Sequence, residues 1–163
     1  AIVAIVLFIA FSFRKVPTHT SPWKFGICAI VALVHDVLIT SGVFALLGLV
    51  YGVEIDGLFI TALLTVMGFS VHDTIVVFDR LRENLKQEQS MSKFANVAND
   101  SLNQTMARSI NTSISTLFTL VALLFLGSNT LFFFLLALVV GIIVGTWSSI
   151  FIATPLLVAW QKK

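Results

Sequence analysis

The stretch from Ser109 to Trp160 contains no Asp, Glu, Lys or Arg, and it constrains the fold more than any other feature of the chain. A helix needs roughly 20 apolar residues to cross a bilayer, so this stretch is long enough for two crossings. Only 11% of the whole chain is charged, whereas a soluble domain has roughly 25%. The composition therefore excludes a soluble globular protein.

The other apolar runs are also continuous, which favours membrane helices over the alternating strands of a membrane barrel. We predict an all-α polytopic membrane bundle with about five crossings and a polar connector. The first run is too short to span a bilayer, so we expect the chain to begin inside a helix. The predicted spans are residues 1–13, 25–51, 58–78, 105–126 and 131–160, and the connector covers residues 79–104.

The connector is predicted to carry an amphipathic helix. Its apolar residues recur at spacings of three and four, which is typical of a helix lying on the membrane surface or against a partner. These residues are Met91, Phe94, Val97, Ala98 and Leu102.

Positive charges lie almost entirely on one side of this topology. The loops at 52–57 and 127–130 have no Lys or Arg, whereas the opposite side has nine. Lys and Arg near short loops stay in the cytoplasm, so the connector and the C-terminus are predicted to be cytoplasmic. The nine residues are Arg14, Lys15, Lys24, Arg80, Arg82, Lys86, Lys93, Lys162 and Lys163.

Three charged residues fall within or beside the predicted spans, namely Asp36, Asp73 and Arg108, and His35 and His72 adjoin the two acids. A charge inside the hydrocarbon region costs at least roughly 2.5 kcal/mol, so these five residues are candidate functional residues.

Asp73 and Arg108 are predicted to lie at similar depth on consecutive spans. Asp73 is roughly 10 Å from the cytoplasmic edge at the helical rise per residue. Movement of a guanidinium near a buried carboxylate changes how readily that carboxylate holds a proton, so the pair fits a proton relay. One alternative is a static salt bridge, and another is an Arg108 that reaches back to the cytoplasmic interface.

His35 and Asp36 are predicted to lie near the middle of the second span. A neutral histidine can orient an adjacent carboxylate or pass a proton to it. The alternative is a hydrogen-bonded packing pair that fixes the helix register.

Polar residues at helical spacing share one face with Arg108, and this face is either a hydrated path or a close helix contact. Gly141 and Gly145 form a GxxxG motif that predicts close helix packing. Cys28 has no second cysteine to pair with, so we interpret it as a packing residue. The polar residues are Thr105, Thr112, Ser115, Thr116 and Thr119.

The chain contains no nucleotide-binding loop, HExxH motif or nucleophile elbow. We therefore expect a protein that is not an enzyme, has no cofactor or metal, and takes its energy from an ion gradient or a partner protein. The net charge of +2 is too small to indicate a nucleic-acid partner.

Residues 68–84, GFSVHDTIVVFDRLREN, resemble the signature of SecF, the membrane subunit or half of the SecD/SecF protein-export machinery in the RND superfamily. Three further segments support this resemblance in the order and spacing of that family. They are VHDVLITSGVFAL at 34–46, SLNQTMARSINTSISTL at 101–117 and GTWSSIFIATPLL at 145–157. The resemblance covers the second to the sixth transmembrane helix of a SecF unit, so we expect the first helix and a periplasmic domain to precede this sequence.

The resemblance implies a proton-driven motor that assists the Sec channel in the plasma (inner) membrane of a bacterium or archaeon. Its implied partners are SecD, separate or fused, the SecY channel complex, the unfolded polypeptide in transit and membrane lipid. Asp73 and Arg108 match family positions implicated in proton transport, and Asp36 matches the acid of an HDV motif. The chain departs from the family at His72, where Asn is common. Two other functions stay open: a scaffold subunit that transduces no energy, and an RND-type exporter of small molecules or lipids.

Overall fold

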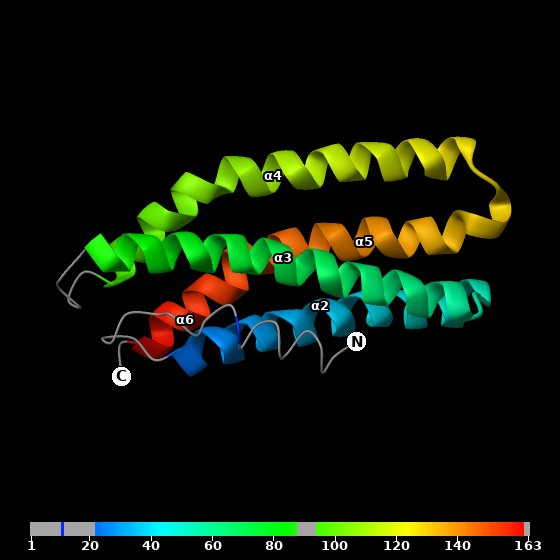
Figure 1. The fold of residues 1–163 in the computed structure, drawn as a ribbon. Coiled ribbons are helices and arrows are strands. Elements are labelled where there is room, and N and C mark those ends of the chain that lie inside the picture. Colours follow the sequence, from blue (N-terminus) through cyan, green and yellow to red (C-terminus); the bar gives the residue numbers. More distant parts are fainter. Residues whose placement is uncertain (1–10, 12–21, 88–93, 162–163) are drawn as a thin grey trace.

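The computed structural model describes residue 11 and residues 22–87 and 94–161. Among these residues, four helical segments are long and apolar enough to cross a membrane (Figure 1), and the predicted all-α membrane bundle is confirmed. Of the predicted span at residues 1–13, only Phe11 is described. The elements are α2 (Pro22–Tyr51), α3 (Gly57–Gln87), α4 (Phe94–Leu126), η3 (Asn129–Leu131), α5 (Phe132–Ser148), the π-helical turn η4 (Ser149–Ala153) and α6 (Thr154–Gln161).

A glycine and an aspartate define the connection between α2 and α3. Gly52 has a φ of +68°, which suits glycine because it has no Cβ, and its N–H donates to the carbonyl of Gly48 at 3.0 Å. The side chain of Asp56 then accepts a hydrogen bond from the N–H of Phe59 at 3.0 Å. This bond satisfies one free N–H in the first turn of α3.

Helices α3 and α4 extend beyond the predicted spans, because the change from apolar to polar residues does not itself end a helix. Helix α3 continues to Gln87, and α4 begins at Phe94. The segment predicted to form a separate amphipathic helix thus supplies the first turns of α4, although Met91 lies outside the described residues. Phe94, Val97 and Ala98 are buried in one apolar cluster with residues of α2, α3 and α6.

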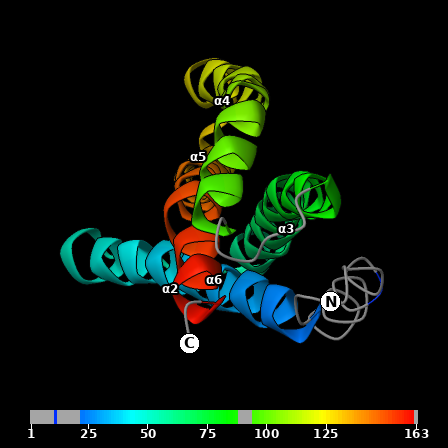
Figure 2. The same ribbon diagram turned by 90° about the vertical axis from the view of Figure 1, so that its left-hand side faces the viewer.

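The helix formed by α5, η4 and α6 occupies the centre of the bundle and contacts α2, α3 and α4 (Figure 2). The GxxxG motif permits its close approach to α3. A Cβ placed on Gly141 would lie 2.2 Å from a methyl carbon of Val66, and one placed on Gly145 would lie 3.1 Å from Cβ of Ser70. The motif therefore fixes α5 against the half of α3 that leads to Asp73.

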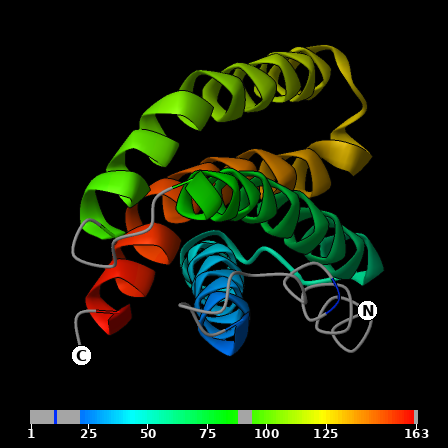
Figure 3. The same ribbon diagram turned by 60° about the vertical axis from the view of Figure 1, so that its left-hand side comes forward.

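The central helix bends between α5 and α6, where the π-helical turn lies (Figure 3). Pro155 follows this turn and explains it, because proline has no N–H to donate to the carbonyl of Phe151. After the bend, α6 packs beside the start of α2. Lys24 there donates from Nζ to the carbonyl of Trp160 at 3.1 Å and to Oε1 of Gln161 at 3.3 Å.

Candidate functional site

Asp73 is buried where α3, α4 and the π-helical turn meet, with 7% of its surface exposed. Its two carboxylate oxygens accept hydrogen bonds from different helices. The hydroxyl of Ser109 on α4 donates to Oδ1 at 2.6 Å, and the hydroxyl of Ser149 donates to Oδ2 at 2.5 Å. Asp73 therefore joins three helical segments through one carboxylate.

A small cavity adjoins Asp73 and brings together three of the candidate residues. It has a volume of about 20 Å³ and is lined by His72, Asp73 and Arg108, with Ser109 and Thr112. This volume is enough for one water molecule. Asp73 and Arg108, which the sequence places at similar depth, thus line the same cavity, although the described residues contain no ion pair between them.

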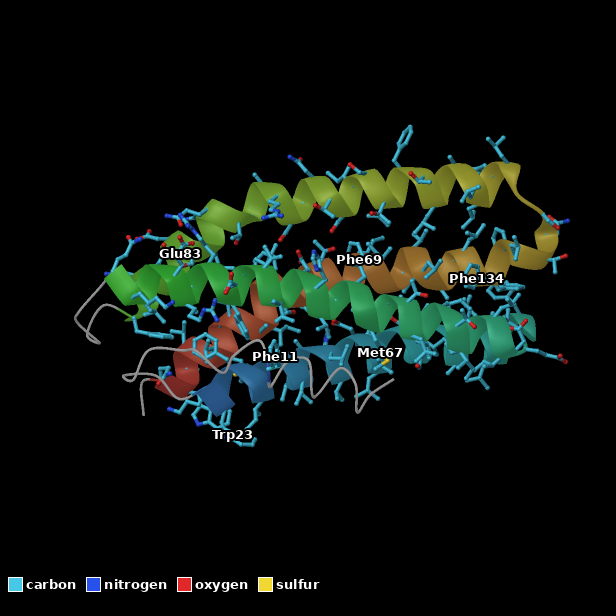
Figure 4. The ribbon with its side chains drawn as sticks, in the orientation of Figure 1. Phe11, Trp23, Met67, Phe69, Glu83 and Phe134 are labelled. Carbon is cyan, nitrogen blue, oxygen red and sulfur yellow. The ribbon has the colours of Figure 1, made fainter. Side chains whose placement is uncertain are left out.

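Arg108 also lines a second, larger cavity of about 540 Å³ between the ends of α3 and α4. Polar residues of both helices form its wall. Arg80 donates from Nε to Oε1 of Gln104 at 2.7 Å and is paired with Glu83 at 2.5 Å. Figure 4 labels one residue of each cavity: Phe69, near the middle of the bundle, lines the small cavity, and Glu83, toward the end of α3, lines the large one.

Asp36 forms a second buried acidic centre, between α2, α3 and α5. It is 0% exposed and accepts hydrogen bonds from the hydroxyls of Ser70 and Ser148 at Oδ2, the latter at 2.8 Å. Nδ1 of His35 lies 3.1 Å from Oδ1 of Asp36, and the side chain of His35 is 31% exposed. The histidine thus connects this carboxylate to the surface of the described bundle.

Residues 147–149 together contact the two acidic centres, each residue contacting one of them. The ring of Trp147 lies 6.4 Å from the ring of His35, Ser148 donates to Asp36, and Ser149 donates to Asp73. The sequence did not identify these serines as hydrogen-bond partners of the two aspartates, since small hydroxyl residues after a GxxxG motif indicate packing equally well. The available signal was their position in GTWSSIFIATPLL, a segment that carries the family resemblance.

The polar face predicted on α4 is turned mostly away from the described bundle. Thr112 and Ser115 are exposed, and each donates its hydroxyl to the carbonyl four residues earlier in the same helix. The buried polar residues of α4 are Ser101, Thr105, Ser109 and Ser113, and of these only Thr105 belongs to the predicted face. His72 is exposed and Asp73 is buried, as expected for neighbouring residues about 100° apart on a helix.

Comparisons with known proteins agree along the chain. Residues 1–163 match the family described as "Protein export membrane protein SecD/SecF, C-terminal". The chain is 56% identical over 163 residues to "Protein translocase subunit SecF" of Thermobaculum terrenum, with 100% of this chain and 50% of the relative covered. It is 50% identical to the protein of the same name from a Synechocystis strain, over 85% of this chain and 44% of the relative.

The fold has a close counterpart among solved structures. It matches a "Crystal structure of SecDF in Super-membrane-facing form" with a TM-score of 0.81 and 43% identity, over 96% of this chain and 20% of that one. The chain spans about half the length of the SecF of Thermobaculum terrenum. The match along residues 1–163, the similarity to these SecF proteins and the shared fold establish that the chain belongs to the SecD/SecF family of protein-export membrane proteins.

Proposed function

We propose that this chain is the membrane part of a SecF-type component that uses a proton gradient to assist protein translocation through the Sec channel. The observation that carries this proposal is the burial of Asp73 beside the cavity that it shares with His72 and Arg108. An ionisable residue kept inside a membrane protein is costly, and proton pathways are one of the few roles that justify it.

The proton path proposed here passes Arg108. This residue lines both the small cavity at Asp73 and the large cavity between the ends of α3 and α4, so it connects the surroundings of the carboxylate with the proposed cytoplasmic side. A shift of the guanidinium toward Asp73 would favour the ionised carboxylate, and a shift away would favour the protonated form. Asp36 and His35 form the second proposed proton-carrying group of the site.

The contacts of Asp73 support a relay over a scaffold held by a static salt bridge. A static bridge needs direct contact between carboxylate and guanidinium, but the described contacts of Asp73 are with two serine hydroxyls. Neutral hydroxyls stabilise a carboxylate without fixing its charge, so they suit a group that changes protonation state.

The proposed partners follow from the family. SecD is proposed as the adjoining membrane half, because a relative from Thermus thermophilus is named "Protein translocase subunit SecDF" and covers 98% of this chain. The exposed Arg108 on α4 supports a protein neighbour there, since a charge facing lipid is costly. The SecY channel complex, the unfolded polypeptide and membrane lipid complete the proposed assembly, in the plasma membrane with a cytoplasmic C-terminus.

The proposal is tested by protein translocation into inverted membrane vesicles that contain the full-length protein and its SecD partner. Asp73→Asn is expected to abolish the part of translocation that depends on the proton gradient and to spare the part driven by ATP. Asp56→Asn is the matched control, because it makes the same change in the loop before α3 and asparagine also caps helices. Unchanged gradient-dependent translocation in an assembled Asp73→Asn protein would contradict the proposal.

A further inference from the structure

Two of the serines that contact the acids, Ser149 and Ser148, each have a second acceptor within reach. The hydroxyl of Ser149 lies 2.5 Å from Oδ2 of Asp73 and 2.9 Å from the carbonyl oxygen of Thr146. The hydroxyl of Ser148 lies 2.8 Å from Oδ2 of Asp36 and 3.1 Å from the carbonyl oxygen of Gly145. A serine hydroxyl carries one hydrogen and two lone pairs, so each serine has one hydrogen for two acceptors.

The two acceptors match the two protonation states of the acid. When Asp73 is ionised, Ser149 donates its hydrogen to Oδ2 of Asp73. When a proton binds to Oδ2, the new O–H of Asp73 donates to the oxygen of Ser149, and the hydrogen of Ser149 turns to the carbonyl of Thr146. The hydroxyl rotates, no proton leaves the serine, and no buried polar group loses its hydrogen bond.

Ser109 differs from Ser149 in a way that selects the oxygen that is protonated. Among the described residues, the hydroxyl of Ser109 has one hydrogen-bond partner, Oδ1 of Asp73. It therefore donates to Oδ1 in both states, and the proton is directed to Oδ2. The arrangement at Asp36 differs, because Ser70 and Ser148 both donate to Oδ2 and, among the described residues, the Ser70 hydroxyl has no second acceptor.

We propose that Ser149 is a positioning residue that reverses its hydrogen bond, so that Asp73 takes up and releases a proton while remaining hydrogen-bonded. The inference rests on the proposed proton-carrying role of Asp73 and adds one residue to it. The serines are neighbours about 100° apart at the start of the π-helical turn, which explains how one turn reaches an acid on α3 and another on α2.

The test is infrared difference spectroscopy on the full-length protein with its SecD partner in lipid vesicles, recorded across a pH titration. The carboxyl band of protonated Asp73 is identified by its loss in Asp73→Asn. In Ser149→Ala this band is expected to move to higher wavenumber, because the carboxyl O–H loses its acceptor. Ser149→Cys keeps the size of the side chain and a weak hydrogen-bonding group, so an intermediate shift is expected.

Two matched variants control for general disturbance of the bundle. Ser148→Ala removes a hydroxyl that donates to Asp36 and not to Asp73, so it is expected to leave the band of Asp73 in place. Ser113→Ala removes a buried hydroxyl that contacts Thr146 at 2.6 Å and neither acid, so this band should again stay unchanged. An Asp73 band at the same wavenumber in wild type, Ser149→Ala and Ser149→Cys would overturn the switch alone, whereas a wild type without a titrating Asp73 band would overturn the proposed function with it.

Discussion

Asp73 and Arg108 line the same small cavity, but the contacts of the Asp73 carboxylate are with serine hydroxyls of two other helical segments. The acid is thus anchored without a direct ionic bond among the described residues, and the arginine is left facing both cavities of the α3–α4 region. In the proposed relay this arrangement keeps the guanidinium free to change its distance from the acid.

The charge and shape of Arg108 are expected to contribute separately. Arg108→Leu removes the charge and should abolish gradient-dependent translocation. Arg108→Lys keeps the charge but loses the planar guanidinium, so it should retain part of the activity. Both variants are compared in the vesicle assay with Lys86→Leu, which removes an exposed positive charge at the end of α3. Equal activity in the two Arg108 variants would argue against a role for its charge.

The contact between α5 and α3 is expected to tolerate no side chain at Gly141. Gly141→Ala would place a methyl group within 2.2 Å of Val66 and should destabilise the protein by about 1–3 kcal/mol, the usual cost of overpacking. Gly68→Ala on α3 is the matched control, because a Cβ there meets nothing within 4 Å. Thermal unfolding of the purified protein in detergent measures both, and equal stability of the two variants would show that the close contact is absent.

Two threonines bury hydroxyls that have no hydrogen-bond partner among the described residues, Thr40 on α2 and Thr74 on α3. An unsatisfied buried hydroxyl is costly, so replacement by the similarly shaped valine should raise stability by about 1 kcal/mol at either position. Thr105→Val is the control, since the hydroxyl of Thr105 donates to the carbonyl of Ser101 at 2.9 Å and its loss should not stabilise. Thermal unfolding that shows a loss of stability in Thr74→Val would mean that its hydroxyl is satisfied in the assembled protein.

The acidic centre at Asp36 is expected to behave as one coupled unit. Asp36→Ala removes the acceptor of Ser70 and should cost about 1–3 kcal/mol for the hydroxyl left unsatisfied. Adding Ser70→Ala removes that hydroxyl as well, so the double variant should be more stable than the sum of the single effects predicts. Unfolding free energies of the four proteins form a double-mutant cycle, and additive effects would contradict the coupling.

The sequence was sufficient to predict much of the fold, because continuous apolar runs and the scarcity of charge leave membrane helices as the main solution. It also identified Asp36, Asp73 and Arg108 as charges in an apolar setting. The lengths of α3 and α4 were less accessible. Both helices continue into the polar connector. There the helical structure is stabilised by the packing of Phe94 in the apolar cluster with residues of α2, α3 and α6, and not by a continuous apolar run.

The hydrogen-bond partners of the buried aspartates were not predictable from the spacing of residues in the sequence. Ser109 and Ser149 reach Asp73 from positions 36 and 76 residues away in the sequence, and their contact depends on the rotation of α4 and of the π-helical turn about their own axes. The same rotation leaves Thr112 and Ser115 exposed together with Arg108, with which they share a face of the helix. Helical periodicity gives the residues of a common face, but only packing decides which face turns inward.

The most direct test of the account is proton movement measured during translocation. Vesicles containing the full-length protein, SecD and the Sec channel are loaded with a pH-sensitive dye, and proton flux is recorded while a polypeptide is translocated. If Asp73 carries the proton, the flux coupled to translocation is present in wild type and in Asp56→Asn and is lost in Asp73→Asn. Coupled proton flux of wild-type size in an assembled Asp73→Asn protein would contradict the assignment of Asp73 to the proton path.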